Sequence, residues 1–268
     1  MRYSELDKLL TEIESRGIHS QVVTSAFRVI PPQWKKYKRL NVVVSIDGLQ
    51  PEHDEPGKPA TYERILKNIV DAHVTIHSTI TSKIASRPGY LEEFLAFWGD
   101  NPAIRKIWFS LFTPQRGAID PEILSPTQRI AVMNELRRLR PLHPKLDMQD
   151  IVIDEIATPP SNPEECIFAR TIETISADLK TQITPCQFGG DSDCSQCGCF
   201  ASMGLAAVEG QSVGRLTAGH LFMASDRIGK GWRKAQETFS SKPATQTEQA
   251  PFKILSANPE QRSTGAKP

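Results

Sequence analysis

The chain has 268 residues, of which 39% are hydrophobic and 24% are charged, and its formal net charge is +1 at pH 7. This composition predicts a soluble globular protein. The balanced charge gives no basic surplus for nucleic acid, and no apolar run reaches the roughly 18 residues of a membrane span. The charged segment 1–14 has a helical pattern and does not resemble a signal peptide. We therefore expect a cytoplasmic protein with reduced cysteines, which binds neither nucleic acid nor membrane.

Residues 1–147 alternate between helical and strand patterns. Leu6, Leu9, Leu10 and Ile13 recur at helical spacing, and Gly17 follows as a candidate C-cap. The apolar run 40–48 is typical of a parallel strand that is buried on both faces. Strands are predicted at residues 19–25, 40–48, 74–81 and 104–113, and helices at 1–14, 34–39, 62–71, 90–98 and 125–140. This alternation indicates βαβ units, hence an α/β fold with a parallel sheet that is open or curled into a barrel.

The pattern changes after residue 147. Residues 148–156 are predicted to form a helix, 158–163 a linker, and 171–185 two short strands around 176–180. Helices are predicted at 201–208 and 215–236. From about residue 240 the sequence is rich in Ser, Thr, Gln, Pro and Lys, which predicts a disordered tail. We therefore divide the chain into an α/β domain at 1–147, a cysteine-rich domain at 148–210, a C-terminal helix at 211–239 and a tail at 240–268.

The cysteines are concentrated in one short segment. Cys186, Cys194, Cys197 and Cys199 lie within residues 186–199, here called the cysteine loop, and Cys166 lies upstream. Thiolates are soft ligands that select zinc or iron–sulfur clusters. An odd number of cysteines without an export signal argues against a disulfide framework. The sequence therefore predicts a metal site.

The spacing of the cysteines alone does not decide which metal this site binds. A cubane iron–sulfur cluster needs four thiolates, whereas the spacing Cys194-x2-Cys197 is also that of a structural four-cysteine zinc site. Because five thiols are available, one of them is surplus. Cys166, Cys186 and Cys194 are the firmer ligands, and Cys197 and Cys199 compete for the fourth position because only one residue separates them.

Polar residues follow the strand at 40–48. Ser45 and Asp47 lie at its carboxyl end, where α/β folds bind ligands. Asp47 could equally cap the turn that follows. We expect His53 to be a surface or turn residue, and His77 to be a buried strand histidine with a local hydrogen-bond partner.

These features together resemble the radical S-adenosylmethionine (radical SAM) enzymes. The strand Val44-Ser45-Ile46-Asp47-Gly48, followed by His53-Asp54, is similar to the family's fourth core strand, and the order of cysteines around a hairpin resembles the SPASM and twitch extensions. The resemblance covers about residues 6–199. It implies a (β/α) TIM-like barrel, S-adenosylmethionine contacts from Ser45 and Asp47, and a twitch-like domain in which the five cysteines supply the ligands of an auxiliary 4Fe–4S cluster.

The chain also departs from the family. The Cys-x3-Cys-x2-Cys motif that holds the cleaving cluster is absent, as is the Gly-Gly-Glu motif, and no cysteine precedes Cys166. The resemblance therefore implies a partial barrel that lacks its first βα units, in a truncated or split enzyme that cannot cleave S-adenosylmethionine alone. A separate chain would supply the N-terminal half-barrel, and the substrate is unknown. The alternative is a non-catalytic module whose structural zinc or iron–sulfur site serves partner binding.

Overall fold

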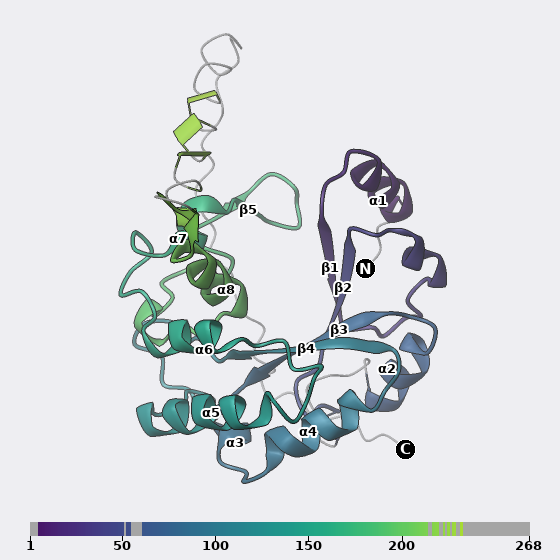
Figure 1. Ribbon diagram of the computed structural model, residues 1–268, viewed down its shortest axis with the longest axis horizontal. Helices are drawn as coiled ribbons and strands as arrows, with labels where there is room; N and C mark the ends of the chain where they lie inside the picture. The colour runs from purple at the N-terminus through teal and green to yellow at the C-terminus, as the bar shows by residue number, and fades with distance from the viewer. Residues whose placement is uncertain are drawn as a thin grey trace, which may run out of the picture.

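A four-stranded parallel sheet forms the centre of the fold (Figure 1). The computed structural model describes residues 5–50, 52–54, 61–213, 216–219, 222, 224–225, 227–228 and 231–232. The strands are β1 (Ser20–Thr24), β2 (Leu40–Ser45), β3 (Val74–Ile80) and β4 (Ile104–Leu111), in the order β1-β2-β3-β4. Each strand pairs with the next in parallel. The predicted α/β class is confirmed.

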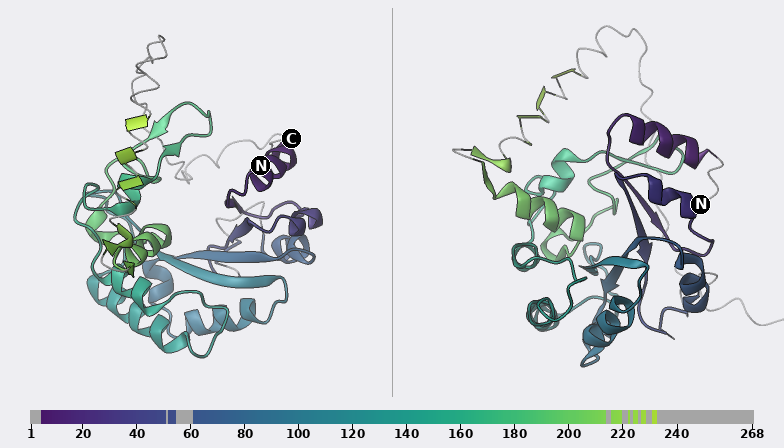
Figure 2. Two further views of the ribbon diagram at one scale, coloured as in Figure 1. Left: turned by 45° about the horizontal axis from the view of Figure 1, so that its top comes forward. Right: turned by 45° about the vertical axis from the view of Figure 1, so that its right-hand side comes forward.

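Helices precede, connect and follow these strands, and several of them cover one face of the sheet (Figure 2). The sequence of helices is α1 (Leu6–Ser15), the 3-10 helix η1 (Pro32–Lys36), α2 (Tyr62–Ile69), α3 (Ser82–Ala85), α4 (Tyr90–Gly99) and α5 (Pro126–Leu139). Gly17 has the positive φ of 72° that suits the residue after a helix. The helices predicted at 62–71, 90–98 and 125–140 are present, and α1 forms the described part of the one predicted at 1–14. The helix predicted at 34–39 is instead a 3-10 helix that ends at Lys36, and the short α3 was not predicted.

The two faces of the sheet differ in polarity. Val44, Ile76 and Phe109 are buried on the helix-covered face, where they form the core. On the opposite face, Ser45 and His77 are only half-buried. The expected burial on both faces holds at Val43, which is 2% exposed on the same face as Ser45, but not at Ser45 itself. On that face Phe200, the first residue of the helix at Phe200–Glu209, stacks on Trp108 of β4 and does so two strands away from Ser45.

A short segment extends the sheet beyond β4. The N–H of Ile107 donates to the carbonyl of Lys145 at 2.7 Å, and the N–H of Asp147 donates to the carbonyl of Ile107 at 3.0 Å. Leu146 thereby forms a parallel bridge with Ile107. The sequence did not predict this segment, because a strand contact of three residues has no periodicity of its own.

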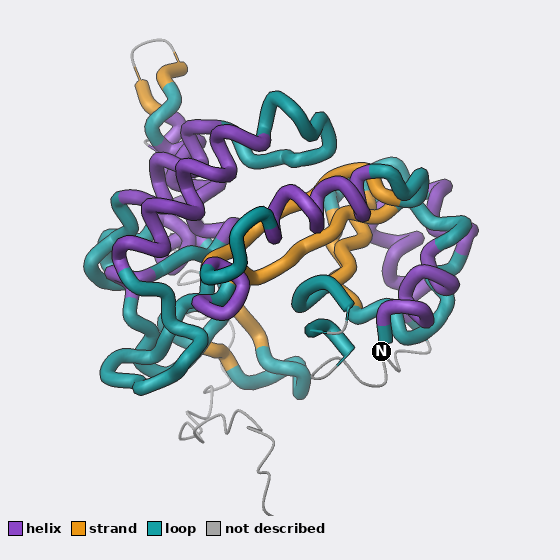
Figure 3. The backbone as a smooth tube through the Cα atoms, turned by 90° about the horizontal axis from the view of Figure 1, so that it is seen from below, coloured by secondary structure: helices purple, strands orange, loops and turns teal. Residues whose placement is uncertain are grey.

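The second half of the chain packs beside β4. It comprises α6 (Asp150–Ala157), α7 (Ile167–Thr171), β5 (Thr174–Ile175), β6 (Gln182–Ile183), the 3-10 helix η2 (Cys194–Gln196) and α8 (Phe200–Glu209). The strands β5 and β6 are the antiparallel pair that the sequence predicted. Helix α8 contacts α6, α7 and β4. Figure 3 shows the sheet between this group of helices and the group around α1.

The region after α8 differs from its prediction. The strands β7 (Ser212–Val213) and β8 (Leu216–Thr217) pair as an antiparallel hairpin, so the predicted helix at 215–236 is wrong at its start. Val213 and Thr217 are β-branched and flank Gly214, which favours a hairpin over a helix. The described residues from Ala218 to Trp232 are helical. The remainder of that predicted helix and the predicted disordered tail lie outside the described residues.

The predictions of a particular barrel and of separate domains go beyond what these elements show. Four parallel strands form an open sheet in the described part of the chain. The partial TIM-like barrel, the twitch-like domain and the predicted domain boundaries therefore stay predictions. Within the described ranges, no helix has the length and apolar character needed to cross a membrane.

Candidate metal centre

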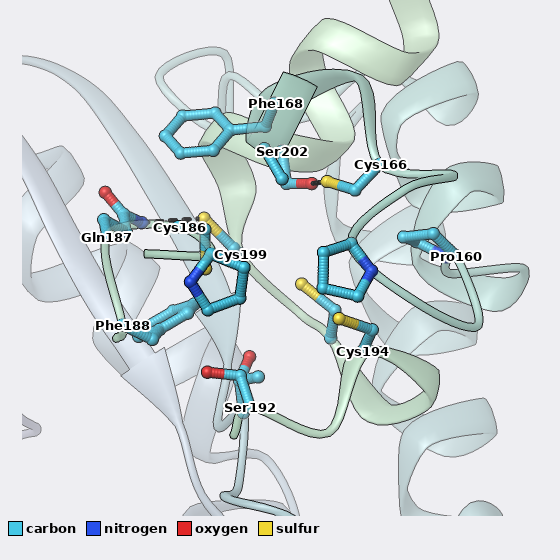
Figure 4. Close-up of a pocket in the computed structure, with 15 residues that line it drawn as sticks. Pro160, Cys166, Phe168, Cys186, Gln187, Phe188, Ser192, Cys194, Cys199 and Ser202 are labelled. Carbon is cyan, nitrogen blue, oxygen red and sulfur yellow. Dashed lines mark hydrogen bonds between the residues drawn. The ribbon is translucent and has the colours of Figure 1, made fainter. Parts of the chain in front are cut away.

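All five cysteines line one pocket at the β4 end of the sheet (Figure 4). Cys166, Cys194, Cys197 and Cys199 are buried and Cys186 is half-buried, and none forms a disulfide. Thr113 after β4, Pro160 and Pro163 before α7, and Phe168 on α7 complete much of the wall. The structure thus brings Cys166 together with the four cysteines of the cysteine loop.

The cysteine loop is attached to β4 through its backbone. The N–H of Leu111 donates to the carbonyl of Gly198 at 2.9 Å, and the N–H of Gly198 donates to the hydroxyl of Thr113 at 3.0 Å. The N–H of Phe200 donates to the hydroxyl of Ser110 at 3.0 Å. These bonds fix residues 197–199 at the carboxyl end of β4, the end of a parallel sheet at which α/β folds place their sites.

A second set of bonds anchors the middle of the loop to the residues after β4. The N–H of Arg116 donates to the carbonyl of Asp191 at 2.7 Å, and the N–H of Asp193 donates to the carbonyl of Pro114 at 2.9 Å. The side-chain oxygen of Gln115 accepts from the N–H of Asp191 at 2.8 Å. Gly190 has a φ of 59° and would bring a Cβ within 2.7 Å of that oxygen. Glycine is therefore required at this turn.

Hydrogen-bond donors surround the sulfurs. The side-chain amide of Gln187 donates to the Cys199 sulfur at 3.0 Å, and the Ser202 hydroxyl lies 3.1 Å from the Cys166 sulfur. Figure 4 shows both contacts. Donors of this kind stabilise metal-bound thiolates and orient them. The sequence did not identify Gln187, Ser202 or Thr113 as parts of the site, although Gln187 directly follows Cys186.

Three of the thiols, those of Cys194, Cys197 and Cys199, have a raised pKa and resist ionisation in the absence of a metal. Burial raises the pKa of Cys194 to about 11, and the neighbouring thiols of Cys197, Cys166 and Cys186 add to this effect. Burial also raises the pKa of Cys199 to about 11, against the opposing hydrogen bond from the backbone N–H of Ser202. Burial raises the pKa of Cys197, which the N–H of Cys199 partly offsets. A metal that binds thiolate would compensate this cost of ionisation.

The five thiols line the wall of the pocket. Within the described ranges, no three His, Cys, Asp or Glu side chains are close enough together to hold a metal ion. Metal binding by Cys166, Cys186, Cys194, Cys197 and Cys199 therefore stays a prediction. The residues fit a cluster in their chemistry, because five soft ligands and several sulfur-directed donors face one largely apolar cavity.

The other predicted ligand residues lie apart from this pocket. Ser45 ends β2 and is in register with His77 on β3, and neither lines the cysteine pocket. The Asp47 side chain is 57% exposed, and its backbone N–H donates to Nδ1 of His53 at 3.0 Å. Binding of S-adenosylmethionine by Ser45 and Asp47 stays a prediction.

The two histidines differ in their surroundings. His53 is 2% exposed, so the expectation of a surface residue is wrong, although it does lie in a turn that closes through the Leu49 carbonyl. Nε2 of His77 lies 2.8 Å from the Ser110 hydroxyl, which is the local partner that the sequence predicted. Burial lowers the pKa of His77, and the carboxylate of Asp47 partly opposes the shift.

Comparison with protein-family models, with curated proteins and with solved structures finds no match to this chain.

Proposed function

We propose that this chain binds a 4Fe–4S cluster in its cysteine pocket, within an α/β protein of the radical SAM type that does not cleave S-adenosylmethionine alone. The observation that carries the proposal is the convergence of all five cysteines on one pocket, although Cys166 and Cys199 are 33 residues apart. A 4Fe–4S cluster supplies one-electron transfer when bound. The chain supplies thiolate ligands, donors to sulfur and a largely apolar wall.

The position of the pocket supports a role for the cluster beside a ligand site. The cysteine loop is bonded to Leu111, Thr113 and Gln115 at the carboxyl end of β4. Ser45 is the last residue of β2 and Asp47 follows it, at the same end of the parallel sheet. Ligands of α/β folds bind at this end, so S-adenosylmethionine would bind at Ser45 and Asp47, two strands away from the cluster.

Anaerobic reconstitution with iron and sulfide tests the cluster directly. We expect about four irons per chain and an electron paramagnetic resonance signal of a reduced 4Fe–4S cluster, both lost in Cys186→Ala. Ser195→Ala is the matched control, because Ser195 is an exposed residue of the same loop. Anaerobically expressed protein that contains no iron, and that takes up none on reconstitution, would contradict the proposal.

A structural zinc site is the second candidate. The N–H of Cys197 donates to the carbonyl of Cys194 at 2.9 Å, which is the tight turn that a Cys-x2-Cys zinc site needs. The same metal analysis separates the two, because about one zinc per chain without iron would indicate this module. The protein would then act by binding a partner.

The contact with S-adenosylmethionine has its own test. Isothermal titration of the ligand into the cluster-loaded chain is expected to show binding that weakens in Ser45→Ala and Asp47→Asn. Asp71→Asn is the control, because Asp71 is exposed and precedes β3, at the opposite end of the sheet. Equal binding by all three variants and by the wild type would exclude the Ser45 and Asp47 site. We expect no 5′-deoxyadenosine from the isolated chain.

A further inference from the structure

Arg129 on α5 is directed at the cysteine loop. Its guanidinium donates to the backbone carbonyls of Gln196 at 3.0 Å and Cys197 at 2.9 Å. A third bond reaches the carbonyl of Ile156 at 3.3 Å. One side chain therefore joins α5, the end of α6 and the segment between two cysteines of the pocket.

All three acceptors of Arg129 are neutral. Among the described residues, no carboxylate forms an ion pair with it, since the nearby carboxylate of Asp193 accepts instead from Ser195 and Gln196. Burial lowers the pKa of Arg129, and the thiol of Cys197 and the carboxylate of Asp193 oppose this shift. A partly desolvated guanidinium without a paired anion is unfavourable unless another negative charge lies nearby.

The other arginines of α5 show the ordinary arrangement. Arg137 pairs with Asp154 at 2.5 Å and Arg138 pairs with Glu92 at 2.8 Å, both at the surface. Arg116, which lies beside the loop, is 57% exposed and pairs with Asp191 at 3.4 Å. Arg129 alone among these four has only carbonyl partners. Its placement therefore leaves a positive charge beside the backbone of Gln196 and Cys197, next to a residue that lines the cysteine pocket.

A cluster or ion held by four thiolates would supply a negative charge beside this guanidinium, in addition to the nearby carboxylate of Asp193. A 4Fe–4S cluster with four cysteine ligands is anionic when oxidised and gains a further negative charge on reduction. A fixed positive charge close to such a cluster favours the reduced form, because the two attract more strongly after reduction.

We propose that Arg129 is the charge-compensating residue of the metal centre, and that it raises the reduction potential of the cluster bound in the cysteine pocket. This inference rests on the proposed function. It assigns to Arg129 an electrostatic role beyond the hydrogen bonds that hold the loop. A purely structural role would fix residues 196–197 without moving the potential of a cluster that is fully loaded.

Two variants separate the charge from the hydrogen bonds. Arg129→Gln keeps an N–H donor for the carbonyls and removes the charge, whereas Arg129→Lys keeps the charge and loses the fork of guanidinium donors. Arg137→Gln is the control, because it removes the same charge from the same helix at a surface ion pair with Asp154. The readout is the midpoint potential of the reconstituted cluster, from a redox titration followed by electron paramagnetic resonance.

We expect a more negative potential in Arg129→Gln and a potential near that of the wild type in Arg129→Lys and Arg137→Gln. An unchanged potential in fully loaded Arg129→Gln overturns the proposal. If Arg129→Gln takes up no cluster, the iron content of Arg129→Lys decides between the two roles. A cluster in Arg129→Lys supports a requirement for the positive charge. Absence of a cluster in Arg129→Lys shows that the guanidinium hydrogen bonds are what the site requires, and overturns the proposal.

The metal content of the wild-type protein tests the proposed function separately from the role of Arg129. If the wild type holds zinc instead of iron, the proposed function fails while the charge role is tested by zinc affinity. Four thiolates around zinc are also anionic, so competition with a chelator is expected to show weaker binding in Arg129→Gln than in Arg129→Lys. Equal zinc affinities overturn the role of Arg129, and so does a wild type that binds neither metal.

Discussion

Gly198 and Leu111 lie backbone against backbone. The Leu111 N–H donates to the Gly198 carbonyl at 2.9 Å, and a Cβ added to Gly198 would lie 2.6 Å from the Leu111 carbonyl oxygen. The residue between Cys197 and Cys199 must therefore be glycine for the cysteine loop to reach β4. This contact places Cys197 and Cys199 against the core of the sheet.

Gly198→Ala is expected to lower the free energy of unfolding by about 1–3 kcal/mol, as overpacking of a tight contact does. It should also lower the iron content after reconstitution, because Cys197 and Cys199 would move. Urea denaturation and iron analysis measure the two effects. The control is Gly204→Ala, since Gly204 lies inside α8 with nothing within 4 Å of an added Cβ. This control should gain about 0.5–1 kcal/mol, and equal losses in both variants would contradict the argument.

The burial of His77 leads us to predict that the folded protein loses stability in acid. Burial lowers its pKa in the folded protein below the usual 6.5. The unfolded chain then binds the proton more readily than the folded protein does. The stability that the neutral His77 contributes to the folded protein is therefore fully present above about pH 6.5 and is lost as the pH falls below it. His77→Gln should remove this part of the pH dependence in urea denaturation between about pH 8 and pH 5. An unchanged slope in the variant would show that other groups cause it.

Asp47 adds a second test of the same effect. Its carboxylate raises the pKa of His77 and so partly offsets the burial. Asp47→Asn should therefore lower the pKa of His77 further and steepen the loss of stability in acid. The double variant with His77→Gln should show no such steepening, which separates the pair from the effect of Asp47 on other groups.

Local patterns in the sequence predicted most elements of the sheet and its helices. The β-branched run predicted at 74–81 is β3 (Val74–Ile80), because such residues fit a buried strand wherever it pairs. The helix predicted from Ser125 is α5, because Ser125 and Gln128 form a capping box that acts within four residues. Both signals lie within the element that they predict.

What the sequence missed depends on contacts between distant residues. Leu146 becomes part of the sheet only through Ile107, and Arg129 reaches Cys197 from another helix. The concentration of cysteines predicted one common site, and the structure places all five on one pocket. The donors Thr113 and Ser202 have no local signal of their own, because hydroxyl residues occur throughout the chain.

Ser125 stabilises the helix that carries Arg129. Its hydroxyl accepts from the N–H of Gln128 at 3.2 Å, and the Gln128 side chain accepts from the N–H of Ser125 at 2.8 Å. Ser125→Ala should cost about 1 kcal/mol in urea denaturation. Ser15→Ala is the control, because that exposed hydroxyl only donates to the Glu12 carbonyl in the last turn of α1. A cost below that of the control would show that the capping box adds nothing to stability.

Gln115 holds a turn in the middle of the cysteine loop. Its side-chain oxygen accepts from the N–H of Asp191 at 2.8 Å, so Gln115→Leu leaves that N–H without its partner. We expect faster hydrogen exchange at 189–193 and a lower iron content after reconstitution. Arg116→Gln is the neighbouring control, because its exposed ion pair with Asp191 contributes little while its backbone bond remains. Similar exchange in the two variants would mean that the backbone bonds of Pro114 and Arg116 suffice to hold the loop.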